Sequence, residues 1–260
     1  YAGPDGYFYW RKGAFAPQSH VLGNGRTFKS SAAHIYRARP DGSQLEVVIT
    51  GGMNNPVGLT FSDTGERFLS GTFFDLSGPG KRDGILHAVY GGMYGRKNDR
   101  VLSPHPSSGG LLPILTQMGP AAPSGIVMPK SDALDMRGDL LCSDFNLRRL
   151  SRHRLIRSGS TYTARTSSFL ESDQSDFHPT DVIEDADGSL LIDWTESGGP
   201  PVVAPTRRGF GSTVIERSIP YDLGGDAEIN YRLAGIEAHF CIPSRHVVSV
   251  LPDSVGRDRV

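Results

Sequence analysis

The sequence of 260 residues has little cysteine, and its two cysteines exclude the common cysteine-based sites. Cys142 and Cys241 form neither the C-x-x-C spacing of a zinc site nor the C-x-x-C-H motif that attaches haem. We expect two buried thiols, and cysteine use then says nothing about the cellular compartment. No apolar run approaches the roughly 18 residues that a membrane-spanning helix needs, so no such helix is expected in this chain.

The chain also lacks an excess of charge of either sign. Its 27 basic and 28 acidic residues give a formal net charge of -1, which excludes the basic footprint of a nucleic-acid-binding protein. It begins at Tyr1 without a methionine or a leader, so we expect any targeting signal to have been removed or never included. Hydrophobic residues make up 37% of the chain, and its 32 glycines and 18 prolines predict many turns.

Four stretches of the sequence share a glycine turn followed by an apolar strand. They are "GPDGYFYW", "SDTGERFLSG", "DMRGDLLCSD" and "DADGSLLIDW", with the turn glycines Gly6, Gly65, Gly138 and Gly188. Before three of them a proline opens another apolar strand, in "NPVGLTF", "APSGIVM" and "HPTDVIE". Repeats of roughly 50 to 70 residues, each worth about four short strands, are typical of β-propeller blades.

We therefore predict a mainly β fold, with a partial, unclosed β-propeller of about three to four blades over residues 1–193. A β-sandwich with unrelated glycine turns is the alternative. The recurring order of proline, strand, glycine turn and strand favours the propeller.

The same residues resemble a known family in long motifs that match in order. Examples are "EVVITGGMNNPVGLTF", "SDFNLRRLSRHRL" and "SDFHPTDVIEDADGSLL". They are similar to the propeller of the PVC-type membrane-bound dehydrogenases of planctomycete-like bacteria, a group similar to the quinone-dependent sugar dehydrogenases. The resemblance implies an oxidoreductase that uses pyrroloquinoline quinone (PQQ) and Ca²⁺ on a sugar or alcohol. It also implies a periplasmic or membrane-associated protein.

The resemblance points to side chains in the loops at the central channel of the propeller. It implies catalytic roles for His178, Asp181 and Arg82, and cofactor-binding roles for Asp83, Asp144 and Asn146. A histidine three residues before an aspartate, at the mouth of an inner strand, can be a base with its orienting group, while an arginine can stabilise the reduced quinone. The favoured alternative is structural, because such side chains also latch neighbouring blades together. No metal ligands are assigned.

Residues 194–243 resemble something unrelated. The stretch "WTESGGPPVVAPTRRGFGSTVIERSIPYDLGGDAEINYRLAGIEAHFCIP" is similar to the end of the ATP-binding domain of HWE-type histidine kinases. The pattern predicts a helix over residues 211–222, distorted by Pro220, and a hairpin with strands at 226–233 and 236–242. The matching phosphate-loop residues are Arg208, Gly209, Gly211 and Ser212. We therefore predict a small α+β segment, residues 194–260, after the propeller.

The kinase resemblance implies ATP with Mg²⁺ and a cytoplasmic protein, but most of the required parts are missing. The sequence has no asparagine-bearing helix for Mg²⁺, no Asp-x-Gly-x-Gly loop for adenine and no phosphoacceptor histidine motif. A phosphate loop alone would bind nucleotide weakly at best, because most of the contact area is gone. We expect no kinase turnover.

Three functions remain open at the level of the sequence. The first is a fragment of a quinone-dependent dehydrogenase propeller with little or no turnover, which would take a small-molecule substrate. The second is a remnant of a sensor histidine kinase. The third is a non-catalytic propeller that acts as a binding or scaffold module, or a non-functional fusion. Nothing in the sequence indicates the oligomeric state.

Overall fold

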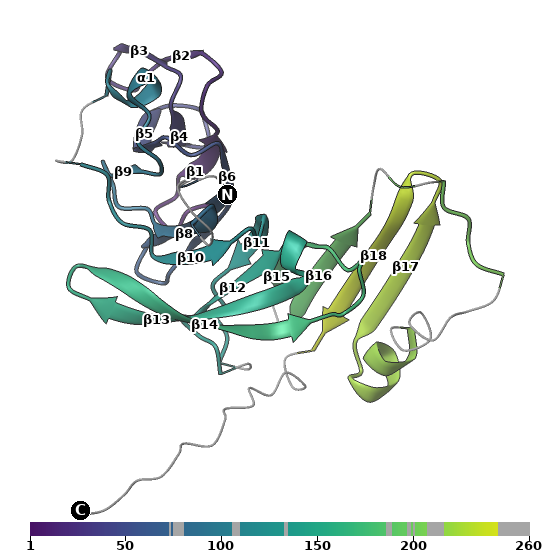
Figure 1. The fold of residues 1–260 in the computed structure, drawn as a ribbon. Helices are drawn as coiled ribbons and strands as arrows, with labels where there is room; N and C mark the ends of the chain where they lie inside the picture. Colours follow the sequence, from purple (N-terminus) through teal and green to yellow (C-terminus); the bar gives the residue numbers. More distant parts are fainter. Residues whose placement is uncertain are drawn as a thin grey trace, which may run out of the picture.

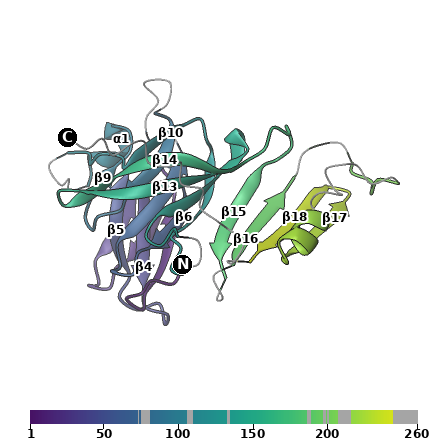
Figure 2. The ribbon, with the colours of Figure 1, turned by 90° about the horizontal axis from the view of Figure 1, so that it is seen from below.

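The computed structural model shows a mainly β chain whose sheets follow one another in an arc (Figures 1 and 2). It describes residues 1–72, 74, 81–105, 110–132, 135–185, 189–196, 199, 201–206 and 216–243. The described strands form four four-stranded sheets and one two-stranded hairpin. No described strand of the fourth sheet pairs with the first sheet, so the arc is not closed. The prediction of a mainly β, partial propeller is confirmed.

The first two sheets come from the N-terminal half of the chain. The first sheet has the order β1-β4-β5-β9, with β1 (Phe8–Lys12), β4 (Ala33–Ala38), β5 (Glu46–Gly51) and β9 (Met93–Tyr94). Beside it lie the hairpin of β2 (Gln18–Val21) with β3 (Thr27–Ser30) and the short helix α1 (Asp99–Leu102). The second sheet has the order β6-β7-β8-β10, with β6 (Asn55–Phe61), β7 (Arg67–Thr72), β8 (Asp83–His87) and β10 (Thr116–Gly119).

The other two sheets follow in the same sense. The third sheet has the order β11-β12-β13-β14, with β11 (Pro123–Val127), β12 (Leu140–Asp144), β13 (Arg149–Ser158) and β14 (Thr161–Glu171). The fourth has the order β15-β16-β18-β17, with β15 (Pro179–Glu184), β16 (Leu190–Thr195), β18 (Gly235–Ile242) and β17 (Asp226–Arg232). Among the described helices, none is long and apolar enough to cross a membrane.

The inner strands β1, β6, β11 and β15 pack beside one another, and β6, β11 and β15 share a repeated irregularity. The pairing register shifts directly after Pro56 in β6, after Pro123 in β11 and after Pro179 in β15. Proline has no N–H to donate, so it suits the first positions of a strand and a bulge. The proline-opened strands of the sequence repeat are therefore equivalent positions in three successive sheets.

Hydrogen bonds between sheets join these strand entrances to one another. The Arg11 Nε donates to the Pro56 carbonyl over 3.0 Å, which connects the first sheet to the second. The Ser70 hydroxyl donates to the Ser124 carbonyl over 3.1 Å, and the Ser124 hydroxyl lies 3.1 Å from the Pro179 carbonyl. A hydrogen bond near the entrance of an inner strand thus joins each sheet to the next.

The hydrophobic core is divided into layers between successive sheets. Ile35 and Leu69 belong to the layer between the first and second sheets. The next layer joins the second and third sheets and contains the fully buried Cys142. Both cysteines are free, and Cys142 is buried as expected, whereas Cys241 is only partly buried. The last layer joins the third and fourth sheets and includes Val182 and Phe240.

The fourth sheet combines strands from both predicted segments. Its β16 pairs with β18 over six residue pairs, from Leu190 with Ile242 to Thr195 with Glu237, and the expected boundary near residue 193 falls inside β16. The predicted hairpin is present as β17 and β18. Of the helix predicted over residues 211–222, residues 211–215 lie outside the described residues, and Pro220 lies in the π-helical turn η2 (Ser218–Asp222), in agreement with the expected distortion of the helix end. Whether the two segments have separate origins stays a prediction.

We expect Phe240→Ala to lower the free energy of unfolding of the whole chain by about 3–5 kcal/mol, as large-to-small substitutions of buried aromatics do. Phe240 is 7% exposed and packs in the layer between the third and fourth sheets. The measurement is urea denaturation followed by circular dichroism. Leu233→Ala, at a position 77% exposed in the same hairpin, is the control. An unchanged transition in Phe240→Ala would mean that the hairpin does not unfold with the sheets.

Gly125→Ala tests the close approach of the inner strands. A Cβ at Gly125 would lie 2.6 Å from the Cα of Asp181 and 1.8 Å from its carboxylate oxygen, so β11 and β15 would have to move apart. We expect a loss of about 1–3 kcal/mol, as for overpacked cores. Gly199→Ala is the control, because nothing lies within 4 Å of a Cβ at that position. Equal stability of the two variants would contradict the packing described.

Candidate functional site

The predicted site residues lie along one edge of the arc, the edge at which the inner strands β6, β11 and β15 begin. We call this the entrance edge. It holds Arg82 and Asp83 at the start of β8, Asp144 at the end of β12, Asn146 in the following turn and His178 just before β15. Asp181 lies inside β15. The site residues predicted from the sequence therefore lie on one edge, but most of them form hydrogen bonds with other residues rather than with one another.

His178 is held by its neighbour sheet. Its Nδ1 lies 2.8 Å from the carbonyl oxygen of Phe145, and its ring stacks on the Phe145 ring with centroids 4.4 Å apart. A carbonyl only accepts hydrogen bonds, so Nδ1 carries the proton and, in the neutral imidazole, Nε2 keeps its lone pair. Phe145 opens the 3-10 turn η1 (Phe145–Leu147) that follows β12. The turn of the third sheet thus fixes the tautomer of a histidine on the fourth.

Asp181 does not orient His178. Its Oδ1 accepts the backbone N–H of Val182 over 2.8 Å, and Phe145 takes the orienting place that the sequence suggested for Asp181. Partial burial raises the pKa of the Asp181 carboxyl, and the nearby Asp193 raises it further, while Arg11 opposes both. A direct catalytic part for Asp181 stays a prediction.

Arg82 and Asp83 join the second sheet to the third. The Asp83 side chain is fully buried, and its Oδ2 accepts hydrogen bonds from Arg82 Nη2 and from the backbone N–H of Ala122, each over 2.8 Å. Ala122 immediately precedes β11, so this carboxylate fixes the entry of the inner strand. Contacts of this kind hold neighbouring blades together, which is the structural role that the sequence favoured over a catalytic one.

Asp144 is a second fully buried carboxylate at the entrance edge. Its Oδ2 pairs with Arg149 Nε over 2.8 Å, and its Oδ1 accepts the Ser151 hydroxyl over 3.0 Å. Burial raises the pKa of Asp144 to about 6, although Arg149 and Ser151 act in the opposite direction. Both oxygens are bound by side chains of the same sheet, which accounts for the position of Asp144 without a cation.

Asn146 supports the same region through the backbone. Its side-chain amide donates to the Pro120 carbonyl over 3.3 Å, and its backbone N–H donates to Ala121 over 2.9 Å. These bonds tie the η1 turn to the segment that enters β11. The position of Asn146 is therefore explained without a cofactor.

A pocket of about 630 Å³ opens beside His178. Its lining holds two carboxylates, a histidine, three hydroxyl groups and several apolar atoms, from Phe145, Ser175, Asp176, His178, Thr180, Thr195, Glu196, Gly199, Val202 and Gly235. Glu196 Oε1 is buried without a hydrogen-bond partner among the described residues. Burial raises the pKa of the Glu196 carboxyl, Asp176 adds to this, and His178 opposes it. This oxygen therefore has unmet hydrogen-bonding capacity within the described part of the chain, but it is buried and presents no surface to the pocket.

The residues around this pocket do not fit PQQ or Ca²⁺. PQQ carries three carboxylates, and the lining that the structure describes offers Asp176 and Glu196 but no lysine or arginine. The predicted cofactor ligands Asp83 and Asp144 are occupied by arginine, hydroxyl and backbone groups. Among the described residues, no three His, Cys, Asp or Glu side chains are grouped to hold a metal ion.

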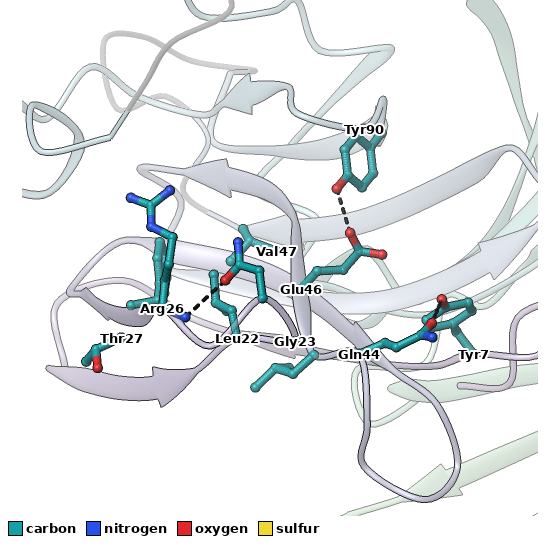
Figure 3. Close-up of a pocket in the computed structure, with 12 residues that line it drawn as sticks. Tyr7, Leu22, Gly23, Arg26, Thr27, Gln44, Glu46, Val47 and Tyr90 are labelled. Carbon is teal, nitrogen blue, oxygen red and sulfur yellow. Dashed lines mark hydrogen bonds between the residues drawn. The ribbon is translucent and has the colours of Figure 1, made fainter.

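A second pocket, of about 610 Å³, lies between the β2–β3 hairpin and β5 (Figure 3). Its polar side chains already bind one another. The Tyr90 hydroxyl donates to Glu46 over 2.6 Å, Tyr7 bonds Gln44, and Asn24 accepts the backbone N–H of Arg26. These bonds occupy Tyr7, Gln44, Glu46 and Tyr90, and the Arg26 and Thr27 side chains line the same pocket.

Two features of the His178 pocket escaped prediction from the sequence. Phe145 follows the recognised aspartate in "SDFNLRR", and an aromatic residue there carries no signal for a stacking partner 33 residues away. Glu196 lies in the stretch "WTES", which was assigned to the kinase-like segment. The predicted phosphate-loop residues Arg208, Gly209, Gly211 and Ser212 lie outside the described residues, and the nucleotide loop stays a prediction.

Solved structures share this architecture. The PQQ-bound form of aldose sugar dehydrogenase from Streptomyces coelicolor matches 92% of this chain and 60% of its own, at 20% identity and a TM-score of 0.50. A structure described as an oxidoreductase (glucose dehydrogenase) from Thermus thermophilus matches 74% of this chain and 56% of its own, at 23% identity and a TM-score of 0.49. No protein-family model and no curated protein sequence matches the chain.

At these identities the likeness shows the fold alone. The chain shares its propeller architecture with the Streptomyces structure, and it spans less than two thirds of the length of both structures. The propeller half of the predicted resemblance is supported by the fold, and nothing in the comparisons bears on the kinase half.

The raised pKa of Asp144 predicts a pH dependence of stability. The carboxyl binds its proton more tightly in the folded chain, where the pKa is about 6, than in the unfolded chain, where it is near 3.8. Its contribution is therefore greatest below pH 3.8 and is lost as the pH rises through 6. Relative to Asp144→Asn, the free energy of unfolding of the wild type should fall over this window.

Urea denaturation at several pH values between about 4 and 7 measures the effect. The exposed Asp63, paired with Arg137 at the surface, gives the control Asp63→Asn. A difference between wild type and Asp144→Asn that does not change with pH would show that Asp144 titrates normally.

Proposed function

We propose that the chain is part of a sugar or alcohol dehydrogenase-like propeller, and that its His178 pocket binds a polyhydroxylated substrate. The observation that carries the proposal is the 2.8 Å hydrogen bond from His178 Nδ1 to the Phe145 carbonyl, because in the neutral imidazole it leaves the lone pair on Nε2 of a histidine that lines a pocket. That arrangement suits a general base for a substrate hydroxyl.

His178 Nε2 would accept a hydrogen bond from one hydroxyl group of the bound polyol. Stacking on Phe145 holds the ring plane, and the bond from Nδ1 to the Phe145 carbonyl fixes the orientation of Nε2. Both supports come from the η1 turn of the third sheet. The base is therefore positioned by packing between sheets rather than by a flexible loop.

Glu196, Asp176 and the hydroxyl groups would bind the rest of the substrate. The Glu196 carboxylate, whose buried Oε1 has no partner among the described residues, would turn toward the pocket to accept a hydrogen bond from a substrate hydroxyl, while Thr180 and Thr195 line the same pocket. A neutral polyol satisfies these groups, and a sugar acid would be repelled by the two carboxylates. This favours an aldose or a polyalcohol over an anionic sugar.

We expect binding with little or no turnover by the chain alone. PQQ would supply the oxidation in the dehydrogenases that the chain resembles, but the described residues around His178 do not fit it. The unclosed arc also leaves the pocket open to water, which weakens electrostatic stabilisation of charge that develops in the reaction.

Titration with glucose and with gluconate, followed by nuclear magnetic resonance, tests the proposal. We expect glucose to bind more tightly than gluconate. His178→Gln and Glu196→Gln should each weaken glucose binding by about threefold to tenfold, the value of one hydrogen bond of about 1 kcal/mol. His239→Gln, at an exposed position on β18, is the control and should leave binding unchanged.

Equal affinity for gluconate, or glucose binding that ignores both pocket substitutions, would contradict the assignment of the pocket. A dye-linked dehydrogenase assay with added PQQ and Ca²⁺ tests turnover separately. Rapid turnover by the wild type would contradict the expectation that the chain alone is inactive.

A further inference from the structure

The first and the fourth sheets form the two ends of the arc, and each has one face that points away from the other four-stranded sheets (Figures 1 and 2). In β1, Tyr9 belongs to the apolar layer with the second sheet, so Phe8 and Trp10 on either side of it point the other way. In β15, Val182 belongs to the layer with the third sheet, so Ile183 points away from it. We call the surface around Phe8 and Trp10 the first-sheet face, and the surface around Ile183 the fourth-sheet face.

Both faces expose large apolar side chains. Phe8 is 50% exposed, Trp10 is 38% exposed and Ile183 is 43% exposed. None of the three belongs to an apolar layer formed by the described residues. On the fourth-sheet face, Leu191 and Cys241 continue the row of Ile183 across β16 and β18. Contiguous exposed apolar groups with a polar rim are typical of a surface that another molecule covers.

The two ends of the arc carry opposite charge. Residues 8–39, which contain β1 to β4, hold six lysines and arginines and no acidic residue. Residues 171–196, which contain β15 and β16, hold nine acidic residues and no lysine or arginine. The net charge of -1 hides this separation, because the two ends nearly cancel in the whole chain.

Acidic side chains of the fourth sheet lie on its exposed face, beside the apolar row. Asp181 pairs with Asp193 across β15 and β16, and His239 on β18 lies between Asp193 and Glu228 on β17. These positions are two residues from the row of Ile183, so their side chains share its face. His239 Nδ1 lies 2.5 Å from the Asp193 carboxylate, and both side chains are about half exposed. Three carboxylates against one histidine leave this surface acidic.

Basic side chains surround the apolar groups of the first-sheet face. Lys12 lies on the same side of β1 as Trp10, two residues further along the strand. The β2–β3 hairpin covers another part of the first sheet with the ring of Phe28, so the neighbouring Lys29 points outward and is exposed. Arg26 is exposed at the turn of this hairpin.

We propose that a second copy of this chain docks its first-sheet face on the fourth-sheet face. The occupant is a second copy because one chain carries both halves of the match, apolar groups with a basic surround at one end and with an acidic surround at the other. Opposite charges steer such an approach, whereas two like faces would repel each other. The contact does not depend on the proposed function.

This contact is head to tail, because it joins two different surfaces. A copy that offers its first-sheet face to one neighbour still has its own fourth-sheet face available. Copies joined in this way close into a ring where the rotation fits and extend as a chain otherwise. In both cases the exposed ends of the arc are covered.

Sedimentation velocity of the full chain, over a series of protein concentrations, tests the proposal. We expect the mean mass to rise with protein concentration. It should fall when sodium chloride is raised from about 50 mM to about 500 mM, because salt screens the charges that attract the two faces. A wild type that stays monomeric at every concentration would overturn the proposal.

Two substitutions at exposed positions block one face each. Phe8→Glu places a carboxylate opposite the acidic face, and Ile183→Lys places an ammonium group opposite the basic face. Each should weaken association more than about tenfold, because like charges at an interface are costly. Tyr221→Lys is the matched control, since Tyr221 is 85% exposed in η2, whose Ile219 packs on the opposite side of the fourth sheet.

An equimolar mixture of the two variants distinguishes this contact from other modes of association. Ile183→Lys keeps an intact first-sheet face, and Phe8→Glu keeps an intact fourth-sheet face. We therefore expect one-to-one complexes in the mixture, while each variant alone stays monomeric. Circular dichroism checks that the variants fold, and Trp10→Glu and Asp193→Lys are second variants for the same two faces. Association that either substitution leaves unchanged, or a mixture of folded variants that stays monomeric, would overturn the proposal.

Discussion

The lateral contact between inner strands is the constraint on which the rest of the structure depends. A Cβ at Gly58 would lie 2.7 Å from the Ser124 carbonyl, so β6 and β11 approach each other to the limit that backbones allow. At this distance the Ser70 hydroxyl reaches the Ser124 carbonyl. The apolar layers, the shared level of the strand entrances and the common edge of the candidate residues all follow from this spacing.

Buried charge at the entrance edge is a consequence of the same constraint. When sheets close on one another, Asp83 and Asp144 lose water and must find other partners, because an unpaired buried carboxylate is costly. Arginines and hydroxyl groups fill that need. Of the residues that resemble a cofactor site in sequence, Asp83 thus joins two sheets and Asp144 binds within the third sheet, whereas His178 binds the Phe145 carbonyl through one ring nitrogen.

The sequence predicted what local chemistry determines. Proline before an inner strand and glycine in the turn after it are set by backbone conformation, so the repeat could be found without a structure. Long-range pairing left no such signal. The addition of β18 to β16 joins residues more than 40 positions apart, across a stretch whose motifs pointed to another family. The contacts of Phe145 with His178 and of Ser30 with His105 also join residues far apart in the sequence, so no local pattern predicts them.

Because Phe145 supports His178, the geometry of the pocket depends on the contact between the third and fourth sheets. His178 belongs to the fourth sheet, and the carbonyl that sets its tautomer belongs to the third. Proteins open in parts at lower free energy than they unfold as a whole. If the fourth sheet detaches by itself, the ring loses its partner and its fixed plane while the other three sheets remain folded. The His178 ring is then a reporter of local opening, and the proposed binding at the pocket would be lost before the chain melts.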